Sequence, residues 1–286
     1  MEEKNKVLGS TLYLVGTPIG NLADISDRAK KVLSEVDFIA AEDTRNSYKL
    51  LSALGIHGEL VSYHEHNRKS SGERIVQRLL SGESCALVTD AGMPAISDPG
   101  EDIVRLCSEA GITVSVVPGP CAAVSALALS ALSTSRFAFE GFLPMVKGER
   151  KKRLTAVRKE ERTMIFYEAP HKLRATLADM CETFGEDRKI SLCRELTKLN
   201  EEVERTTLGG AVLLYDQKEP RGEYVLIIDG ATDGVVSDEC EELLSLAPEE
   251  HVAFYEKGGM SRMDAIKRAA KDRGMSKSEL YKLLNT

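Results

Sequence analysis

The sequence predicts an α/β protein built from two α/β domains, with a small helical region at its C-terminal end. Three observations favour this class. Short apolar runs alternate with helical segments in the first half, hairpin-like strands occur in the second half, and short helices fill the last part of the chain. A length of 286 residues also exceeds that of one typical domain. We expect an N-terminal α/β domain at 1–132, a second α/β domain at 133–232 and a helix-turn-helix-like C-terminal appendage at 233–286.

The first half has the strand–helix alternation that is typical of a parallel sheet. Apolar, β-prone runs predict strands at 11–15, 37–41, 60–63, 86–89 and 113–117. The segments between them predict helices at 28–36, 46–54, 73–81 and 101–110. Ser26 and Asp27 are suitable residues to begin the first of these helices. An Ala/Leu-rich helix at 122–132 follows, and Ser133-Thr134-Ser135 marks the expected domain boundary.

The second half mixes strands and helices without regular alternation. Extended segments are predicted at 137–144, 163–167, 189–193, 203–207 and 222–230. Helices are predicted at 149–161, 172–184 and 208–214. This order indicates an α+β arrangement in which some neighbouring strands pair as hairpins.

Two short helices are predicted near the C-terminus, at 263–271 and 277–284. Gly274 would end the first helix and Ser276 would begin the second. This spacing is compatible with a helix-turn-helix, whose basic faces would contact RNA or DNA. Packing of a small helical appendage explains the same pattern, and the sequence leaves both interpretations open.

Charge is distributed unevenly over an acidic chain whose net charge is −7. The stretch 147–162 holds eight lysines and arginines against three glutamates, and 257–286 holds eight against three acidic residues. Two basic stretches on an acidic body favour contact with a polyanion over limited faces, although solvated helical faces give the same pattern. The six cysteines lie far apart without a CxxC pair, which indicates reduced thiols and a cytoplasmic location. No apolar run approaches the roughly 18 residues of a membrane span, so no membrane association is expected.

Loops rich in small residues follow two neighbouring strands, at 90–100 and 118–123. The carboxyl ends of neighbouring parallel strands are where open α/β sheets bind ligands, so these loops predict a ligand site. A further loop at 16–22 contains glycines but matches neither GxGxxG nor a P-loop, which argues against NAD(P) binding and nucleotide hydrolysis. His64 and His66 lack a third ligand at suitable spacing, so we expect no metal site.

Eight ordered motifs give the chain a family resemblance. They are GTPIGNL, AEDTR, TDAGMPAISDPG, VPGPCAA, GFLP, FYEAPH, RELTK and GEYVLII, distributed over residues 16–228. The chain resembles the tetrapyrrole-methylase-like, class III S-adenosylmethionine methyltransferases. Within them it is most similar to the branch that methylates the ribose 2′-hydroxyl of a cytidine in 16S rRNA. The resemblance implies S-adenosyl-L-methionine as cofactor, the small ribosomal subunit as partner, a homodimer, and two domains of the tetrapyrrole-methylase type with the cofactor between them.

The resemblance also implies a set of cofactor contacts from both domains. Carried over position by position, these are Asp90, Gly92, Met93, Ile96, Cys121, Ala122, Ala169, Leu196 and Val225. Two of them depart from the usual pattern, since Met93 stands where DAGTP has threonine and Cys121 where GPSAA has serine. Cysteine is a weaker hydrogen-bond donor than serine, so we expect altered cofactor affinity but retained function.

A ribose hydroxyl is a weak acid, so its methylation would benefit from a general base. Asp43 and Glu42 are the first candidates, with Arg45 orienting a carboxylate or binding a phosphate. A simple helix cap for the helix at 46–54 explains the same residues. Glu195 and His171 are alternative bases. The predicted RNA contacts are Lys151, Lys152, Arg153, Arg262, Lys267, Arg268, Lys271 and Arg273.

Two other functions are compatible with the sequence. A methyltransferase of this family could act on a tetrapyrrole or another small molecule, although such an acceptor does not require a basic C-terminal region. A regulator could instead read nucleic acid with residues 238–286 while the α/β part senses a metabolite. The polar residues at the loop ends favour the enzyme.

Overall fold

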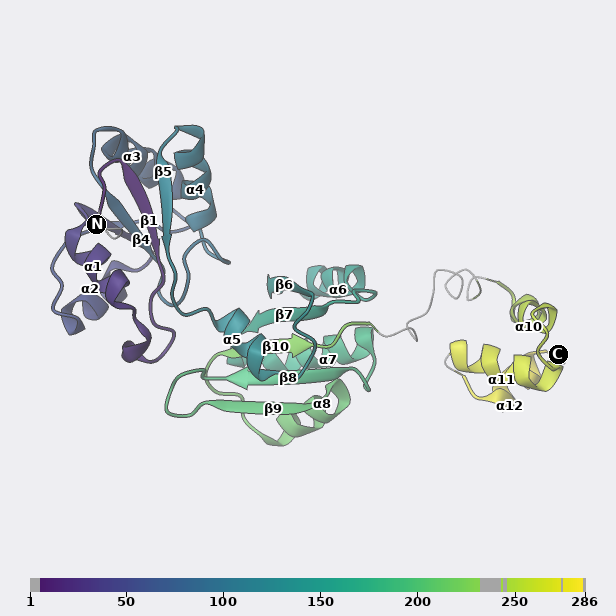
Figure 1. Ribbon diagram of the computed structural model, residues 1–286. Coiled ribbons are helices and arrows are strands. Elements are labelled where there is room, and N and C mark those ends of the chain that lie inside the picture. Colours follow the sequence, from purple (N-terminus) through teal and green to yellow (C-terminus); the bar gives the residue numbers. More distant parts are fainter. Residues whose placement is uncertain (1–5, 232–242, 244–245, 274, 285–286) are drawn as a thin grey trace. The chain divides into compact units, whose positions relative to one another are not determined.

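The first sheet holds five parallel strands in the order β3-β2-β4-β1-β5. Figure 1 labels three of them, β4, β1 and β5. In this computed structural model the strands are β1 Thr11–Val15, β2 Phe38–Ala41, β3 Glu59–Ser62, β4 Cys85–Val88 and β5 Thr113–Val117. The structure describes residues 6–231, 243, 246–273 and 275–284, without the side chain of Lys271. The strand–helix alternation expected for the first half is therefore confirmed, with each strand within one residue of its predicted position.

Helices cover both faces of the first sheet. They are α1 Asp27–Glu35, α2 Thr44–Ala53, α3 Arg68–Leu80 and α4 Gly100–Glu109, with a 3₁₀ turn, η1, at Leu22–Asp24. Apolar residues of α1 and α2 pack with alternate residues of β1, β2 and β4 on one face, and those of α3 and α4 pack on the other. Ser26 caps α1 as predicted, because its hydroxyl accepts a 3.1 Å hydrogen bond from the Ala29 N–H.

Helix α3 begins at Arg68, five residues before the predicted start. Its first turn lacks buried apolar side chains, so hydrophobic periodicity gives no signal there. Gly72 interrupts the pattern as well. A Cβ at this position would lie 3.1 Å from Cδ1 of Leu106, so the glycine permits close packing of α3 on α4.

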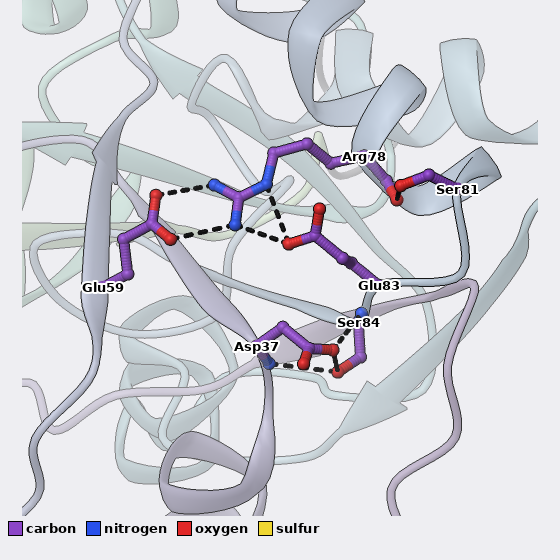
Figure 2. Close-up of polar contacts among 6 residues, drawn as sticks. All are labelled: Asp37, Glu59, Arg78, Ser81, Glu83 and Ser84. Atoms are coloured by element: carbon purple, nitrogen blue, oxygen red, sulfur yellow. Dashed lines mark hydrogen bonds and ion pairs between the residues drawn. The ribbon is translucent and has the colours of Figure 1, made fainter.

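Polar contacts join the starts of β2, β3 and β4, at the edge of the sheet opposite the loops at 90–100 and 118–123 (Figure 2). The guanidinium of Arg78 binds Glu59 at 2.6 Å and Glu83 at 2.6 Å, and stacks 3.7 Å above the ring of Phe38. The hydrogen bonds from these two carboxylates raise the pKa of Arg78. Because a planar guanidinium can bind two carboxylates and stack at once, this contact fixes the helix α3 on the sheet.

The second sheet has the order β6-β7-β10-β8-β9. Its elements are β6 Phe137–Phe142, β7 Thr163–Glu168, β8 Lys189–Arg194, β9 Glu202–Thr207, β10 Tyr224–Ile228, α6 Lys147–Ala156, η2 Pro170–Lys172, α7 Leu173–Phe184 and α8 Leu208–Gln217. Strands β8 and β9 pair as an antiparallel hairpin, which confirms the expected change of architecture. Helices α6, α7 and α8 bury one face of this sheet.

The other face of the second sheet packs against α5, Ala122–Leu129. Ala126 and Leu127 of this helix are buried against Ile165 and Val225 of the sheet. The helix follows β5 directly, so the loop at 118–121 passes from the first sheet to the second. The division of the chain at 132 stays a prediction.

Contacts within the chain define two compact units, residues 1–230 and 231–286. The described helices of the second unit are α10 Pro248–Lys257, α11 Arg262–Asp272 and α12 Lys277–Leu283. They share a small apolar core, and Ser276 begins α12 with its side chain accepting from the Glu279 N–H. The predicted cap at Gly274 lies outside the described residues.

Candidate active site

A cavity of about 640 Å³ lies within residues 1–230 and is lined by loops of both sheets. Most of its residues come from the carboxyl ends of β2 and β4, the start of α5, and the ends of β7 and β8 with the segments that follow them. Ile19 after β1, Phe142 of β6 and the start of β10 complete the lining. All nine predicted cofactor contacts line this cavity: Asp90, Gly92, Met93, Ile96, Cys121, Ala122, Ala169, Leu196 and Val225. Residues that are 135 positions apart in the chain, from Asp90 to Val225, are thereby brought to one site.

Glycines allow three loops to approach one another closely beside the cavity. Thr17 and Gly92 exchange backbone hydrogen bonds of 2.9 and 3.1 Å, and Gly92 has a φ of +88°. A Cβ on Gly16 would lie 2.7 Å from Cα of Gly119 and 2.7 Å from Sδ of Met93. No larger residue fits at position 16 without moving a loop, so the two glycines set the loop spacing.

Two of the lining loops hold non-glycine residues in the left-handed region. Ala95 and Ser97 have φ values of +67° and +66°, and Glu195 and Thr197 have values of +52° and +65°. Such backbone is costly and persists where neighbouring contacts impose it. The first loop is held by Asp98, whose carboxylate accepts hydrogen bonds from the N–H groups of Ala95 and Gly100.

The cavity has a buried apolar floor and an exposed rim. Leu196 and Val225 on the floor are each 6% exposed, and Cys193, which pairs with Val225 across the sheet, is fully buried. On the rim, Ile96 is 47% exposed and Phe142 is 56% exposed. A ligand would therefore bury its apolar part against the second sheet and leave the rim open to a second molecule.

The cavity is also acidic. Its lining includes Lys198 and six carboxylate side chains, namely Glu42, Asp90, Asp98, Glu168, Glu195 and Glu223. Four of these carboxylates are already engaged by backbone N–H groups or by Lys198. Asp98 accepts from two N–H groups, Glu168 from the Ala169 N–H and the Thr176 hydroxyl, and Glu195 and Glu223 bind the Lys198 ammonium.

The remaining two carboxylates each accept one hydrogen bond from a neutral side chain. Thr89 donates to Oε2 of Glu42 at 2.8 Å, and the amide of Asn46 donates to Oδ2 of Asp90 at 3.1 Å. The first bond links the segments that follow β2 and β4, and the second links helix α2 to the loop that follows β4. Glu42 and Asp90 keep acceptor capacity for a ligand or for a proton.

The predicted catalytic residues separate into two groups. Glu42 lines the cavity, and so do the alternatives Glu195 and His171, whereas Asp43 and Arg45 are not among the lining residues. Asp43 caps α2, because its carboxylate accepts from the Arg45 N–H at 2.8 Å. It also binds the Arg45 guanidinium at 2.7 Å, and these hydrogen bonds lower the pKa of Asp43 to about 2.

Ion pairs engage several of the predicted RNA contacts. On α6, Lys151 binds Glu182 at 2.7 Å and Arg153 binds Glu140, while the exposed Lys152 has no such pair among the described residues. Helix α6 also ends at Ala156, earlier than the predicted 161, with Val157 capping it through backbone hydrogen bonds.

In the C-terminal unit the predicted basic residues have different surroundings. Arg273 is held inside the unit by Nδ1 of the buried His251 and by backbone oxygens. Arg262 lies 3.6 Å from Glu256 and Arg268 lies 3.4 Å from Asp272, whereas Lys267 is exposed. The side chain of Lys271 lies outside the described part of the chain.

The lining also includes residues to which the sequence-based prediction gave no role, among them Thr89, Phe142 and Tyr167. A glycine within the extended segment at 137–144 was the available signal for Phe142, since an isolated glycine in a strand indicates a bulge. For Thr89 and Tyr167 the available signal was their place in the motifs TDAGMPAISDPG and FYEAPH.

The described residues contain no group of three or more histidine, cysteine or acidic side chains arranged to hold a metal ion. His64 and His66 lie with their rings 5.9 Å apart in an edge arrangement. None of the described helices is both long enough and apolar enough to cross a membrane.

Comparisons with known proteins agree on one family. The family described as Tetrapyrrole (Corrin/Porphyrin) Methylases matches residues 11–212. A protein of Halalkalibacterium halodurans named ribosomal RNA small subunit methyltransferase I is 47% identical over 275 residues, covering 96% of this chain and 94% of that protein. The protein of the same name from Bacillus subtilis is 46% identical, covering 94% of this chain and 92% of its own length.

The fold is shared with solved structures at much lower identity. Uroporphyrin-III-C-methyltransferase from Thermus thermophilus superimposes with a TM-score of 0.56 at 21% identity, covering 77% of this chain and 94% of its own. This likeness confirms the predicted fold class, and the sequence matches confirm the predicted family. The chain belongs to the tetrapyrrole methylase family.

Proposed function

We propose that this protein transfers a methyl group from S-adenosyl-L-methionine to 16S rRNA of the small ribosomal subunit, at the ribose 2′-hydroxyl of a cytidine. The proposal rests mainly on the cavity. Segments of both sheets line it, and all nine expected cofactor contacts are among the lining residues. Relatives that are 46–47% identical over most of the chain carry the name of a small-subunit rRNA methyltransferase, which supports this acceptor.

The residues of the cavity fit S-adenosyl-L-methionine, the methyl donor of this family. A volume of about 640 Å³ lies in the usual range of roughly 300–1,000 Å³ for small-molecule sites. The apolar floor at Leu196 and Val225 suits an adenine ring, and the excess of carboxylates suits a ligand with cationic groups. Gly92 lines the cavity, and the absence of a side chain there lets its backbone groups reach a ligand. When bound, the cofactor supplies an electrophilic methyl group on sulfur.

Methyl transfer needs the acceptor oxygen in line with the bond that breaks, so positioning accounts for much of the rate. We assign the proton acceptor to Glu42, whose carboxylate lies on the cavity wall and is held by Thr89. Asp43 is a poor base by comparison, because the bound Arg45 stabilises its ionised form. Asp90, held by Asn46, would bind hydroxyl or amino groups of the cofactor. The ligand-facing roles of the other cavity residues are those expected from the family resemblance.

Binding of the RNA strand is assigned to exposed cations outside the acidic cavity. Lys152 on α6 and Lys267 on α11 are exposed and suited to contact phosphates. Lys151 and Arg153 would first have to leave Glu182 and Glu140. Helix α6 is basic and contributes no residue to the acidic cavity lining, which supports a substrate whose ribose and base enter the site while its phosphates remain outside.

We infer a homodimer in the cytoplasm, with domains at 1–132, 133–232 and 233–286. Strand β5 is an edge of the first sheet and exposes Val116, and exposed apolar edges are commonly covered by another chain.

An acceptor panel tests the function. Labelled S-adenosyl-L-methionine is incubated with the protein and, separately, with small ribosomal subunits that lack the modification, naked 16S rRNA, and uroporphyrinogen III. Label in RNA from the subunits or from the naked rRNA supports the proposal. Label in the tetrapyrrole alone would favour the small-molecule alternative, and binding of nucleic acid without transfer to any acceptor would favour a regulator.

A further inference from the structure

Strand β6 contains a bulge that changes which residue faces the cavity. Its pairing with β7 is regular up to Phe139, which lies opposite Ile165, and then shifts so that Gly141 lies opposite Phe166. Phe142 consequently lies opposite Tyr167. Without the extra residue the glycine would occupy that position, so the bulge sets an aromatic side chain beside Tyr167.

The contacts of the three rings follow from this shift. In a regular strand, side chains three positions apart point to opposite faces of the sheet. Phe139 and Phe142 nevertheless both contact Tyr167, with ring centroids 5.2 and 5.4 Å from it. Tyr167 is itself packed against the buried layer formed by α5 and the second sheet. One side of the Phe142 ring is therefore packed against the partly buried Tyr167.

Gly141 forms part of the bulge and lies next to the loop at 90–100, which follows β4 of the first sheet. Its φ of +63° is a conformation that favours glycine, and a Cβ there would lie 2.8 Å from Oγ of Ser97. Ser97 belongs to the loop that also carries Ile96. The bulge thus places Phe142 on the cavity rim, near the loop that follows β4.

The exposure of Phe142 is unusual for a large aromatic side chain on a site wall. It lines the cavity and yet is 56% exposed, whereas Leu196 and Val225 on the floor are 6% exposed. A small cofactor would bind against the buried residues of the floor in preference to the exposed ring of Phe142 on the rim. A supported aromatic face that stays open to solvent at the rim suits a flat partner arriving from outside, and nucleobases of unpaired RNA bind aromatic side chains in this way.

We propose that Phe142 is an acceptor-binding residue on which the base of the methylated nucleotide stacks, so that its ribose hydroxyl enters the cavity. The inference rests on the proposed function, since it assumes an RNA acceptor. A base taken out of its stack needs a surface that replaces the lost stacking, and the Phe142 ring supplies one. Because every base has an aromatic face, this contact holds the nucleotide without identifying it.

The test compares steady-state methylation of modification-free small ribosomal subunits by the full-length protein, four variants at position 142 and one control variant. Phe142→Ala is expected to raise the KM for subunits by roughly 10- to 100-fold, the range for loss of one stacked base. Phe142→Tyr and Phe142→Trp should retain near-normal values, while Phe142→Leu, which keeps apolar bulk without a ring, should resemble alanine. The Kd for S-adenosyl-L-methionine should stay within about twofold of wild type in all four variants.

Phe137→Ala is the matched control, because Phe137 lies on the same strand, is 42% exposed, and is not among the cavity-lining residues. It should leave the KM unchanged. An unchanged KM in Phe142→Ala, full rescue by leucine, or a KM rise equal in Phe137→Ala would overturn the proposal. A matching rise in the cofactor Kd would instead assign the ring to the cofactor. Failure of the wild type to methylate RNA would remove the proposed function itself, which separates the two failures.

Discussion

The carboxylate of Glu42 accepts a 2.8 Å hydrogen bond from the hydroxyl of Thr89, and both side chains line the same cavity. The bond joins the carboxyl ends of β2 and β4, which are neighbours in the first sheet. It fixes the orientation of a carboxylate whose second oxygen remains available. Asp43, the next residue along the chain, is committed to Arg45 and to the cap of α2.

Glu42→Gln should slow methyl transfer while the cofactor still binds. Glutamine keeps the shape and can still accept from Thr89, but it cannot take a proton at neutral pH. Loss of a general base typically lowers a rate by roughly 10²- to 10⁴-fold, so we expect a fall in that range. Single-turnover transfer at saturating subunits measures it, with calorimetry for the cofactor Kd.

Asp43→Asn is the matched control for this prediction. Asparagine also caps helices well, so α2 should be preserved while the carboxylate and its pair with Arg45 are lost. The transfer rate should fall far less than in Glu42→Gln. If Asp43→Asn were the slower of the two variants, the assignment of the base to Glu42 would be wrong.

Gly16→Ala should weaken cofactor binding and destabilise residues 1–230. The added Cβ would lie 2.7 Å from backbone of Gly119, so the loops at 16–20 and 118–121 must separate. Overpacking of this kind costs about 1–3 kcal/mol, and we expect the cofactor Kd to rise at least roughly tenfold. Urea unfolding and calorimetry measure the two effects.

The control is Gly148→Ala in α6, where an added Cβ meets nothing within 4 Å. Alanine is the better helix former, so this variant should gain about 0.5–1 kcal/mol and bind the cofactor normally. Equal cofactor affinity in both glycine variants would show that the spacing of the loops does not determine binding.

Lys152→Glu should weaken binding to small subunits more than Lys151→Glu does. Lys152 is exposed without an ion pair among the described residues, whereas Lys151 is held by Glu182 at 2.7 Å. Losing one phosphate contact should lower the slope of log K against log salt by about 1. Binding titrations between low and moderate salt measure the slope, and identical slopes for both variants and wild type would count against an RNA contact at this helix.

His251 should make the C-terminal helical unit sensitive to acid. Burial and the nearby Arg273 lower the pKa of this fully buried imidazole below its ordinary value of about 6.5. The unfolded chain therefore binds a proton more readily than the folded one. The stability of α10–α12 should be complete above pH about 7 and fall as the pH drops below about 6.5.

Hydrogen exchange of the α10–α12 amides in the full-length protein, corrected for intrinsic exchange rates, measures this dependence at pH 5 and 7.5. His251→Gln can still accept from Arg273 but does not titrate, so it should reduce the difference between the two pH values. His57→Gln, at an exposed position of the other unit, should leave it unchanged. Equal protection at both pH values in wild type would contradict the role of His251.

Local patterns predicted much of the fold because each strand and most helices carry their own periodicity and caps. The strands of the first sheet and the cap at Ser26 are of this kind. The strand order β3-β2-β4-β1-β5 and the packing of α5 on the second sheet depend on contacts between distant segments. No local pattern encodes them.

The same distinction holds for the site. Small-residue loops and family motifs indicated nine residues that all line the cavity, and their contact with the cofactor stays a prediction. The separate surroundings of Glu42 and Asp43 could not be predicted, because Thr89 lies 47 positions from Glu42. The place of Phe142 was missed since it depends on a shift of pairing register with β7. Ion pairs such as Lys151–Glu182 likewise join segments that only the fold brings together.

The central claim is that this cavity transfers a methyl group to a ribose of 16S rRNA. The most direct measurement uses S-adenosyl-L-methionine with a labelled methyl group, modification-free small ribosomal subunits, and nuclease digestion of the recovered 16S rRNA to nucleosides followed by mass spectrometry. We expect label in 2′-O-methylcytidine, at a level that is strongly reduced with Glu42→Gln. Label confined to a base-methylated nucleoside, or RNA without label, would contradict it.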